Sequence, residues 1–446
     1  MRPIDYFDRG AAANPDTVFA AGNDLQFTYR EAKSLTDNIA KGLFQAGFEV
    51  GDSVAVYSPN DPGAVVCIFG IYRAGGAWVP VNVRNAASTN AEYMAYVKTR
   101  WLFFHSSVLE AVEQVIPSLD ELKGIICFDS DQTPYPSLAD FIEVGRATEI
   151  PDWSDAFGAP DVVFSRWPTG GTTGPSKGVE ISNRAATTMI EQGLNCYVGD
   201  ETREIVHLAV APITHAAGVV ITIYAAVGGS TIVLPAFDAK AVLETIQQQR
   251  VTHIFLPPTA YYAMLEEAKR KSYDTASLRQ VLIAAAPVSP DKFREGVEVF
   301  GPVICQCYGQ AEAPMLISWL SPRVVSAAAE GQHPERLKSA GQVTSCTQVG
   351  ILDDDGRLMP TGERGEICCR GPLVTPGYFE KPEATAEGLD KMLAVNHLGA
   401  VALVLALEKR LRGSPASQVV AVSSEAHRWA SGKELKAYIA DPATSG

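Results

Sequence analysis

Residues 169 to 178 read Thr169-Gly170-Gly171-Thr172-Thr173-Gly174-Pro175-Ser176-Lys177-Gly178. Glycine lets the backbone turn its N–H groups toward an anion, threonine hydroxyls add donors, and lysine supplies positive charge. A Walker A loop has Gly before its lysine and Ser or Thr after it, whereas Lys177 lies between Ser176 and Gly178. The stretch therefore predicts a polyphosphate-binding loop of another kind. An ordinary Gly- and Thr-rich surface loop is the alternative interpretation.

Short apolar runs occur on both sides of this loop, and helical patterns separate them. Examples lie at residues 53–58, 124–128, 205–210 and 253–256. Strands that are apolar throughout are typical of parallel sheets covered by helices on both faces. The pattern predicts an α/β fold.

Residues 339–379 follow a different pattern. Strand-like runs at 347–352 and 365–369 are joined by the turn signals Asp354-Asp355-Gly356 and Pro360-Thr361-Gly362. Runs joined in this way are typical of antiparallel pairing. The segment therefore predicts a small antiparallel barrel or sheet.

The composition narrows the classes of partner. The chain has 446 residues, is 46% hydrophobic and has a formal net charge of −14. Nucleic acids and anionic membranes attract basic surfaces, so we expect a small-molecule substrate instead. The start has no signal-like apolar segment, and the longest apolar runs reach about half the roughly 20 residues that span a bilayer. We therefore expect a cytoplasmic protein without a transmembrane segment, whose eight cysteines are structural thiols.

Three further stretches contain candidate site residues. They read Pro212-Ile213-Thr214-His215-Ala216-Ala217-Gly218, Ala284-Ala285-Ala286-Pro287 and Tyr308-Gly309-Gln310-Ala311-Glu312-Ala313-Pro314. A tyrosine ring such as that of Tyr308 can stack on adenine, and a carboxylate such as that of Glu312 can hold Mg²⁺ against phosphate oxygens. A structural histidine at 215 and a solvated acid at 312 are the alternatives.

In order and spacing, these stretches resemble the motifs of the AMP-forming adenylating superfamily, which includes acyl-CoA synthetases, firefly luciferase and peptide-synthetase adenylation domains. Residues 362–367, 370–372, 376–378 and 381–385 match later motifs of the family that are chiefly structural. The resemblance implies two doubly wound, mostly parallel sheets plus a small antiparallel β-barrel. It assigns residues 1–389 to an AMP-binding domain, with a β-rich subdomain at about 339–389.

The resemblance also implies roles for individual residues. Residues 169–177 would hold the β- and γ-phosphates of ATP, Lys177, Thr172 and Glu312 would be catalytic, and Glu312 and Thr169 would bind Mg²⁺. The acid would contact His215, Ala216 and Gly218, where small side chains leave room. The other implied nucleotide contacts are Gly170, Gly171, Thr173, Gly174, Ala285, Ala286, Pro287, Tyr308, Gly309 and Gln310.

The chain departs from the family pattern within several motifs. Gly170 replaces a serine, Ser176 a proline, and alanines replace the two glycines of the Gly-Gly-Ala-Pro turn. Ala311 replaces a threonine that would contact the α-phosphate, which removes a hydroxyl donor.

After Thr385 the resemblance stops, and neither the Thr-Gly-Asp segment nor the small domain with the catalytic lysine follows. Residues 390–446 predict a helix at 390–412 and a strand at 418–423, and they resemble an incomplete short-chain dehydrogenase. Tyr438 is followed four residues later by Pro442 rather than lysine, so we expect no independent oxidoreductase activity. A fusion or rearrangement near Leu389 would explain this tail.

The resemblance implies an ATP-dependent carboxylic acid:CoA ligase that forms an acyl-adenylate, with ATP, Mg²⁺ and CoA as cofactors and cosubstrate. Without the missing aspartate and lysine, we expect ATP binding but severely impaired thioester formation. The alternative from another class is a catalytically dead nucleotide- or acyl-binding module, or a nonfunctional fusion product. A Walker-type ATPase would instead release ADP. The identity of the acid, fatty or other, and the oligomeric state stay open at this point.

Overall fold

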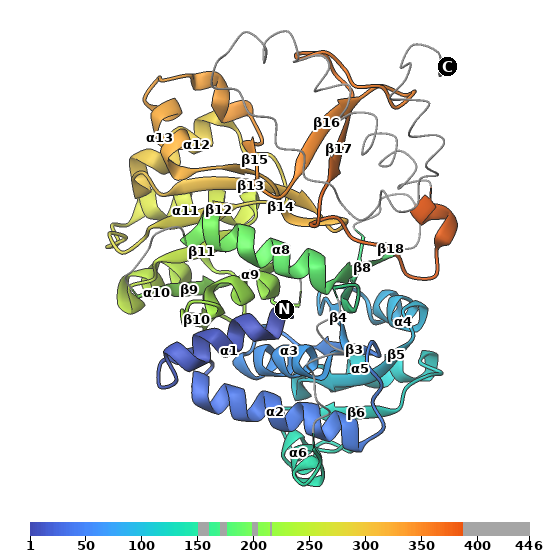
Figure 1. Cartoon of the computed structure of the whole chain (residues 1–446). Helices are drawn as coiled ribbons and strands as arrows, with labels where there is room; N and C mark the ends of the chain where they lie inside the picture. The colour runs from blue at the N-terminus through green and yellow to red at the C-terminus, as the bar shows by residue number, and fades with distance from the viewer. Residues whose placement is uncertain (150–159, 170–175, 199–203, 215, 387–446) are drawn as a thin grey trace.

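The computed structural model describes residues 1–149, 160–169, 176–198, 204–214 and 216–386. Two large sheets, with helices between and around them, make up most of this part of the chain (Figure 1). The tail predicted at 390–446 and the junction near Leu389 lie outside the described residues.

The larger sheet has nine strands in the order β15-β14-β13-β12-β11-β9-β10-β1-β2. The strands from β13 to β1 in this order run parallel, and the edge strands β14, β15 and β2 are antiparallel to their neighbours. The bounds are β1 Val18–Gly22, β2 Leu25–Thr28, β9 Val206–Ala209, β10 Ser230–Val233, β11 His253–Leu256, β12 Gln280–Ile283, β13 Ile304–Gln310, β14 Ala313–Leu320 and β15 Gln342–Val343.

The second sheet has seven strands in the order β18-β8-β7-β4-β3-β5-β6. Five of them run parallel, and β8 and β18 add antiparallel strands at one edge. The bounds are β3 Ser53–Tyr57, β4 Ala77–Val81, β5 Thr99–Phe104, β6 Gly124–Cys127, β7 Val163–Pro168, β8 Gly178–Ser182 and β18 Gly377–Tyr378. The predicted pair of mostly parallel sheets is therefore confirmed.

Helices form three layers around the sheets (Figure 1). The inner layer lies between the sheets and contains α1 Pro3–Ala13, α2 Tyr29–Gln45, α3 Pro62–Ala74, α8 Asn183–Gly193 and α9 Ala216–Ala225. Helices α10 Ala239–Gln249, α11 Pro258–Arg270, α12 Pro290–Phe300 and α13 Pro322–Ala329 cover the outer face of the larger sheet. Helices α4 Ala87–Tyr96 and α5 Leu109–Val115 cover the outer face of the smaller one, and α6 Leu138–Gly145 packs on α2.

Alternate side chains of β3 belong to different cores. On β3, Val54 and Val56 join the core between the sheets, whereas Ala55 and Tyr57 join the outer core under α4 and α5. Successive side chains of a strand point to opposite faces, so a strand buried on both faces is apolar at most of its positions. This burial explains the uninterrupted apolar runs in the sequence.

The β-rich segment has the predicted antiparallel pairing. Strands β16 Gln348–Leu352 and β17 Glu366–Arg370 form a two-stranded sheet, which is all of the expected barrel that the described residues contain. Strand β18, from the same segment, instead pairs with β8 of the seven-stranded sheet.

The cysteines and the helices of the described residues both bear on expectations drawn from composition. All eight cysteines are free. Six of them are buried in apolar cores at less than one-tenth exposure, as expected of structural thiols: Cys67, Cys127, Cys305, Cys307, Cys368 and Cys369. Cys196 and Cys346 are half-buried. Among the described helices, none has the length and apolarity needed to cross a membrane.

His207 on β9 is a titratable group buried in this fold. Its ring lies 4.7 Å from that of Tyr224, and burial, followed by the neighbouring His253, lowers its pKa to about 3. A histidine in an unfolded chain has a pKa of about 6.5. The stability that depends on neutral His207 is therefore complete above about pH 6.5 and is lost as the pH falls toward the folded-state pKa.

Between pH 6.5 and 5 we expect His207 to account for a loss of roughly 1.5 kcal/mol in the free energy of unfolding, because the unfolded state binds a proton that the folded state excludes. The variant His207→Gln should lack this part of the pH dependence. Denaturant titrations at both pH values measure it for the two proteins. The same loss in the variant as in the unaltered protein would contradict the prediction.

Candidate active site

The motifs singled out in the sequence meet at one edge of the nine-stranded sheet. Strands β9, β11, β12 and β13 run parallel, with the pairs His207 with His253, His253 with Gln280, and Ile283 with Gln306 in register. The carboxyl ends of parallel strands face one edge, where α/β proteins bind their ligands. The segments that follow these strands, at 210–214, 284–287 and 308–312, therefore lie along the same edge.

Glu312 lies in the tight turn between β13 and β14. The two strands are antiparallel, and Gln310 pairs with Ala313, which leaves only Ala311 and Glu312 to make the turn. Gly309 is required just before this turn, because a Cβ there would lie 2.5 Å from the backbone carbon of Met315. The Tyr-Gly part of the motif therefore has a packing reason, and the turn fixes the position of Glu312.

The predicted phosphate loop is the connection between β7 and β8. Pro168 pairs with Gly178, the Thr169 N–H donates to the Lys177 carbonyl oxygen at 2.9 Å, and the Lys177 N–H donates to Thr169 Oγ1 at 3.1 Å. These bonds close the base of the loop and leave the Lys177 side chain exposed. The loop residues Gly170, Gly171, Thr172, Thr173 and Gly174 lie outside the described residues, as does His215.

Tyr378 joins the two charged candidates. The Lys177 ammonium lies 4.9 Å from the centroid of the Tyr378 ring, and the Tyr378 hydroxyl donates to Glu312 Oε1 at 2.8 Å. Burial, and then the Glu312 contact, raises the pKa of Tyr378, so its phenol stays protonated and remains a donor at neutral pH. Lys177 and Glu312 come from different sheets, and one tyrosine contacts both.

In the sequence, Tyr378 belongs to a stretch expected to be chiefly structural, 376–378. Its position results from the pairing of β18 with β8, which brings together residues about 200 positions apart. No local sequence pattern indicates such a long-range contact. The signal that does exist is the Pro-Gly-Tyr stretch that follows the β-rich segment.

The residues predicted to contact adenine lie on adjacent strands. Tyr308 is half-buried at the end of β13, where burial raises the pKa of its phenol, and residues 285–287 are exposed after the neighbouring β12. Ala285 has φ +75°, a left-handed conformation that glycine adopts more easily than alanine. This left-handed conformation explains why the corresponding turn of the family has glycine at this position.

Ala285→Gly should raise the free energy of unfolding by up to about 1 kcal/mol, because relief of the left-handed strain exceeds the added entropy of the unfolded chain. Ala286 does not have positive φ, so Ala286→Gly is the matched control. It should lower the free energy of unfolding by about 0.5 kcal/mol. Thermal or denaturant unfolding of both variants checks this, and a shift of the same sign in both would disprove the explanation.

Asn60 fixes the segment before His215. It follows β3 of the smaller sheet, and its amide donates to the carbonyl oxygens of Ala211 at 3.1 Å and Leu234 at 3.0 Å. Its Oδ1 accepts from the Ile213 N–H at 2.9 Å. A cavity of about 40 Å³ beside it is lined by residues from connections that follow strands of both sheets, Ser58, Pro59, Asn60, Val83, Arg84, Pro212, Thr214 and Pro235. No signal in the sequence marked Asn60.

Gly218 was predicted to leave room for an acid, and the structure gives it a packing reason. A Cβ at this position would lie 1.9 Å from the Ile213 carbonyl oxygen and 3.4 Å from Trp78. The role of Ala216 and Gly218 in binding an acid stays a prediction. A larger cavity, of about 630 Å³, lies beside β6 and is lined by none of the motif residues.

An α/β protein with a lysine loop, a turn carboxylate and a tyrosine at one sheet edge is of the class that binds nucleotides. Residues 7–379 match the family model described as AMP-binding enzyme. The chain belongs to this family.

The proteins similar in sequence include CoA ligases. The chain is 37% identical over 228 residues to the medium/long-chain-fatty-acid–CoA ligase FadD8 of Mycobacterium tuberculosis, a match that covers 51% of this chain and only 38% of that protein. It is 30% identical over 390 residues to the feruloyl-CoA synthase of Amycolatopsis sp, covering 85% of this chain and 72% of that one.

Solved structures share the fold. The anthranilate CoA ligase AuaEII in complex with anthranoyl-AMP has a TM-score of 0.77 at 21% identity, and the match covers 87% of this chain and 73% of that one. ATP-bound MatB from Rhodopseudomonas palustris has a TM-score of 0.72 at 21% identity, covering 87% and 74%. At this level of identity, the likeness concerns the fold.

Proposed function

We propose that this chain is an AMP-forming acid–CoA ligase, or the large domain of one. The observation that carries the proposal is the cluster in which Tyr378 contacts both Lys177 and Glu312. One tyrosine thus contacts both a cation of the predicted phosphate loop and a carboxylate that could hold the counter-ion of a nucleotide. Membership of the AMP-binding family and the CoA ligases among its relatives support the same reaction.

ATP would bind along the carboxyl edge of the nine-stranded sheet. Its β- and γ-phosphates would contact Lys177 and the loop that begins at Thr169, and its adenine would lie against Tyr308 and residues 285–287. The carboxylate of the acid then attacks the α-phosphorus, the bond to the β-phosphate oxygen breaks, and pyrophosphate leaves with the electron pair. Attack by the CoA thiol on the acyl-adenylate gives the thioester and AMP. Positioning and electrostatics carry most of such a reaction.

Glu312 is suited to hold Mg²⁺ at this site. Its Oε1 accepts the hydroxyl of Tyr378, so its Oε2 is left for a cation, and its side chain is only half-buried. Oxygen ligands and a partly hydrated setting match the preferences of Mg²⁺, and Thr169 could supply a second oxygen. When bound, Mg²⁺ would neutralise charge on the phosphate oxygens.

The acid would enter near residues 212–218, with His215, Ala216 and Gly218 as its predicted contacts. The named relatives act on medium- to long-chain fatty acids and on ferulate, so an apolar organic acid is the class we propose. Asn60 would hold the segment before His215 in place through its three hydrogen bonds. We also propose a cytoplasmic location.

Pyrophosphate release from ATP, measured with a panel of aliphatic and aromatic acids, tests the proposal. We expect release that depends on the acid, with AMP as the nucleotide product. Calorimetry that detects ATP binding without any pyrophosphate release would favour the alternative of a binding module. ADP as the product would instead indicate a Walker-type ATPase.

For residues 390–446 we propose the relation to short-chain dehydrogenases that their sequence suggests. Segments 395–399 and 418–427 support it, and the family match at 7–379 ends before them. Absence of NAD(H) binding by the chain, measured by fluorescence titration, is the expected result, because residues 390–446 contain no Gly-rich loop of the kind that binds a dinucleotide. Binding of this cofactor would contradict our reading of the tail as incomplete.

A further inference from the structure

We propose that Tyr378 is a positioning residue that fixes the side chains of Lys177 and Glu312 relative to each other. The segment 377–381 in turn fixes Tyr378 in place. This segment is called the strap below. The inference rests on the proposed function, because it assigns to Tyr378 a part in the same site. Tyr378 itself need not touch a substrate.

The strap begins directly beside the lysine loop. Gly377 pairs with Glu180 and Tyr378 with Val179, and the Phe379 N–H donates to the Gly178 carbonyl oxygen at 2.7 Å. Gly178 is the residue that follows Lys177. The backbone of the strap is thus bonded to the end of the loop, and the Tyr378 ring is presented to the lysine.

The same chain segment also contacts the other sheet. Just before the strap, the Thr375 N–H donates to the Glu312 carbonyl oxygen at 2.9 Å, and the Tyr378 hydroxyl donates to the Glu312 carboxylate. Glu312 is therefore held through both its backbone and its side chain. Because β8 and the β13–β14 turn belong to different sheets, this segment bridges the two sheets across the site (Figure 1).

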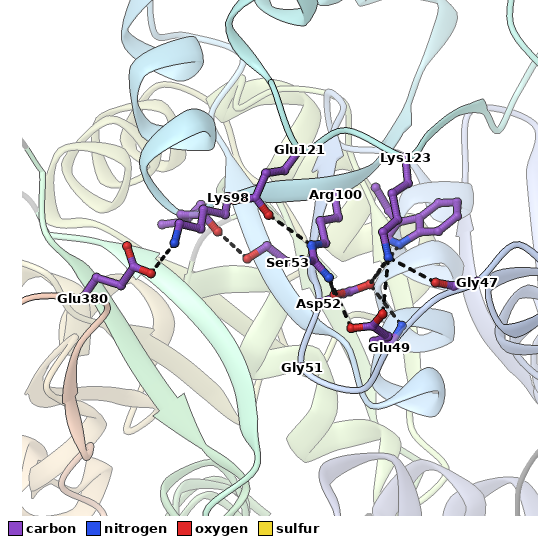
Figure 2. A network of polar contacts seen from close by, with 12 residues as sticks. Gly47, Glu49, Gly51, Asp52, Ser53, Lys98, Arg100, Glu121, Lys123 and Glu380 are labelled. Atoms are coloured by element: carbon purple, nitrogen blue, oxygen red, sulfur yellow. Dashed lines mark hydrogen bonds and ion pairs between the residues drawn. The ribbon is translucent and has the colours of Figure 1, made fainter.

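A clasp at Phe379 and Glu380 anchors the strap on the seven-stranded sheet. The Arg166 guanidinium lies 4.5 Å from the centroid of the Phe379 ring, and the Tyr96 hydroxyl donates to the Phe379 carbonyl oxygen at 2.5 Å. Lys98 forms an ion pair with Glu380 (Figure 2). Arg166 is itself held by Glu180 at 3.1 Å. The neighbours of Tyr378 are thus fixed on the side away from the site.

Ion pairs also join the chain at the amino ends of β3 and β5 in the smaller sheet. Figure 2 shows Arg100 between Asp52 and Glu121, with Arg100 Nη1 2.8 Å from Asp52 Oδ1 and Nε 3.2 Å from Glu121. Lys98, which contacts the strap, is two residues before Arg100 on the same chain segment. The clasp therefore contacts a part of the sheet that is itself stabilised by ion pairs.

Two variants separate the contacts of Tyr378. Tyr378→Phe keeps the ring under Lys177 and removes only the hydroxyl bond to Glu312, and Tyr378→Leu removes both. Tyr273→Phe is the matched control, because Tyr273 donates to Glu267 at 2.9 Å in the same way and packs against the outer core of the nine-stranded sheet. Pyrophosphate release and calorimetric ATP binding would be measured for all three.

For Tyr378→Phe we expect kcat to fall about tenfold with the KM for ATP changed less than twofold, because the loop lysine keeps its support. For Tyr378→Leu we expect ATP binding to weaken about tenfold as well. Tyr273→Phe should leave all values unchanged. Equal kcat in Tyr378→Phe and the unaltered protein would overturn the positioning role, as would equal losses in both tyrosine-to-phenylalanine variants.

A double-mutant cycle tests whether the clasp acts through Tyr378. If it does, Phe379→Leu combined with Tyr378→Phe should lose no more activity than the worse single variant, and additive losses would contradict the inference. An unaltered protein without pyrophosphate release would overturn the proposed function instead. In that case a crystal structure of Tyr378→Phe still decides, because an unmoved Glu312 side chain would refute positioning by Tyr378.

Discussion

Lys177→Met should slow acyl-adenylate formation by roughly 10² to 10³, the usual loss when one charge-assisted donor to a developing charge is removed. Lys177 is the only cation of the described loop residues, and its exposed ammonium faces the edge where Glu312 lies. Methionine keeps the length and the apolar stem of lysine, so the closure of the loop base by backbone bonds should persist. Single-turnover formation of acyl-AMP from labelled ATP measures the effect.

The control for this variant is Lys240→Met. Lys240 is an exposed lysine on α10 with a 3.9 Å ion pair to Glu244, a surface contact worth little. It should retain full activity and stability. We also expect ATP to bind about tenfold more weakly to Lys177→Met, since the lost charge contacts the ground state too. If Lys177→Met formed acyl-AMP at an unchanged rate and bound ATP with unchanged affinity, the Lys177 loop would not be part of the active site.

Glu312→Gln should reduce the same rate by about 10², because the amide removes the negative charge that a cation on the phosphates requires. The amide oxygen can still accept the Tyr378 hydroxyl, so the turn between β13 and β14 should keep its geometry. Measurements across a range of Mg²⁺ concentrations should show a higher Mg²⁺ requirement for the variant.

Glu267→Gln is the matched control for this charge. Glu267 also accepts a tyrosine hydroxyl, that of Tyr273, but it lies on α11 away from the motifs. It should have normal activity at every Mg²⁺ concentration. If Glu312→Gln behaved in the same way, Glu312 would be a solvated acid, the alternative that its sequence left open.

The fold was predictable because its strands are buried on both faces. In the run 253–256 every residue after His253 is apolar, so the extent of the strand is clear from the sequence, and β11 has these bounds in the structure. The β-rich segment was harder, because pairing there depends on partners distant in sequence. Strand β18 was expected within the barrel region but pairs with β8 of the seven-stranded sheet. Local turn signals could not indicate this long-range pairing.

The candidate site was predictable where a motif carries its own geometry. The turn that presents Glu312 and the base of the Lys177 loop are both local hairpin connections, so their amino-acid sequence alone indicates where they lie. Tyr378 and Asn60 were missed because each acts through contacts between the two sheets. We expected Gly218 to leave space for a ligand. In the structure, close packing against Ile213 and Trp78 is itself a reason for glycine at this position.

A crystal structure with ATP and Mg²⁺ tests the central claim most directly. The account predicts phosphate oxygens within hydrogen-bond distance of Lys177 Nζ, the metal ion on Glu312, and adenine against the ring of Tyr308. A nucleotide bound elsewhere, or one at this edge with Lys177 and Glu312 both turned away from its phosphates, would contradict it.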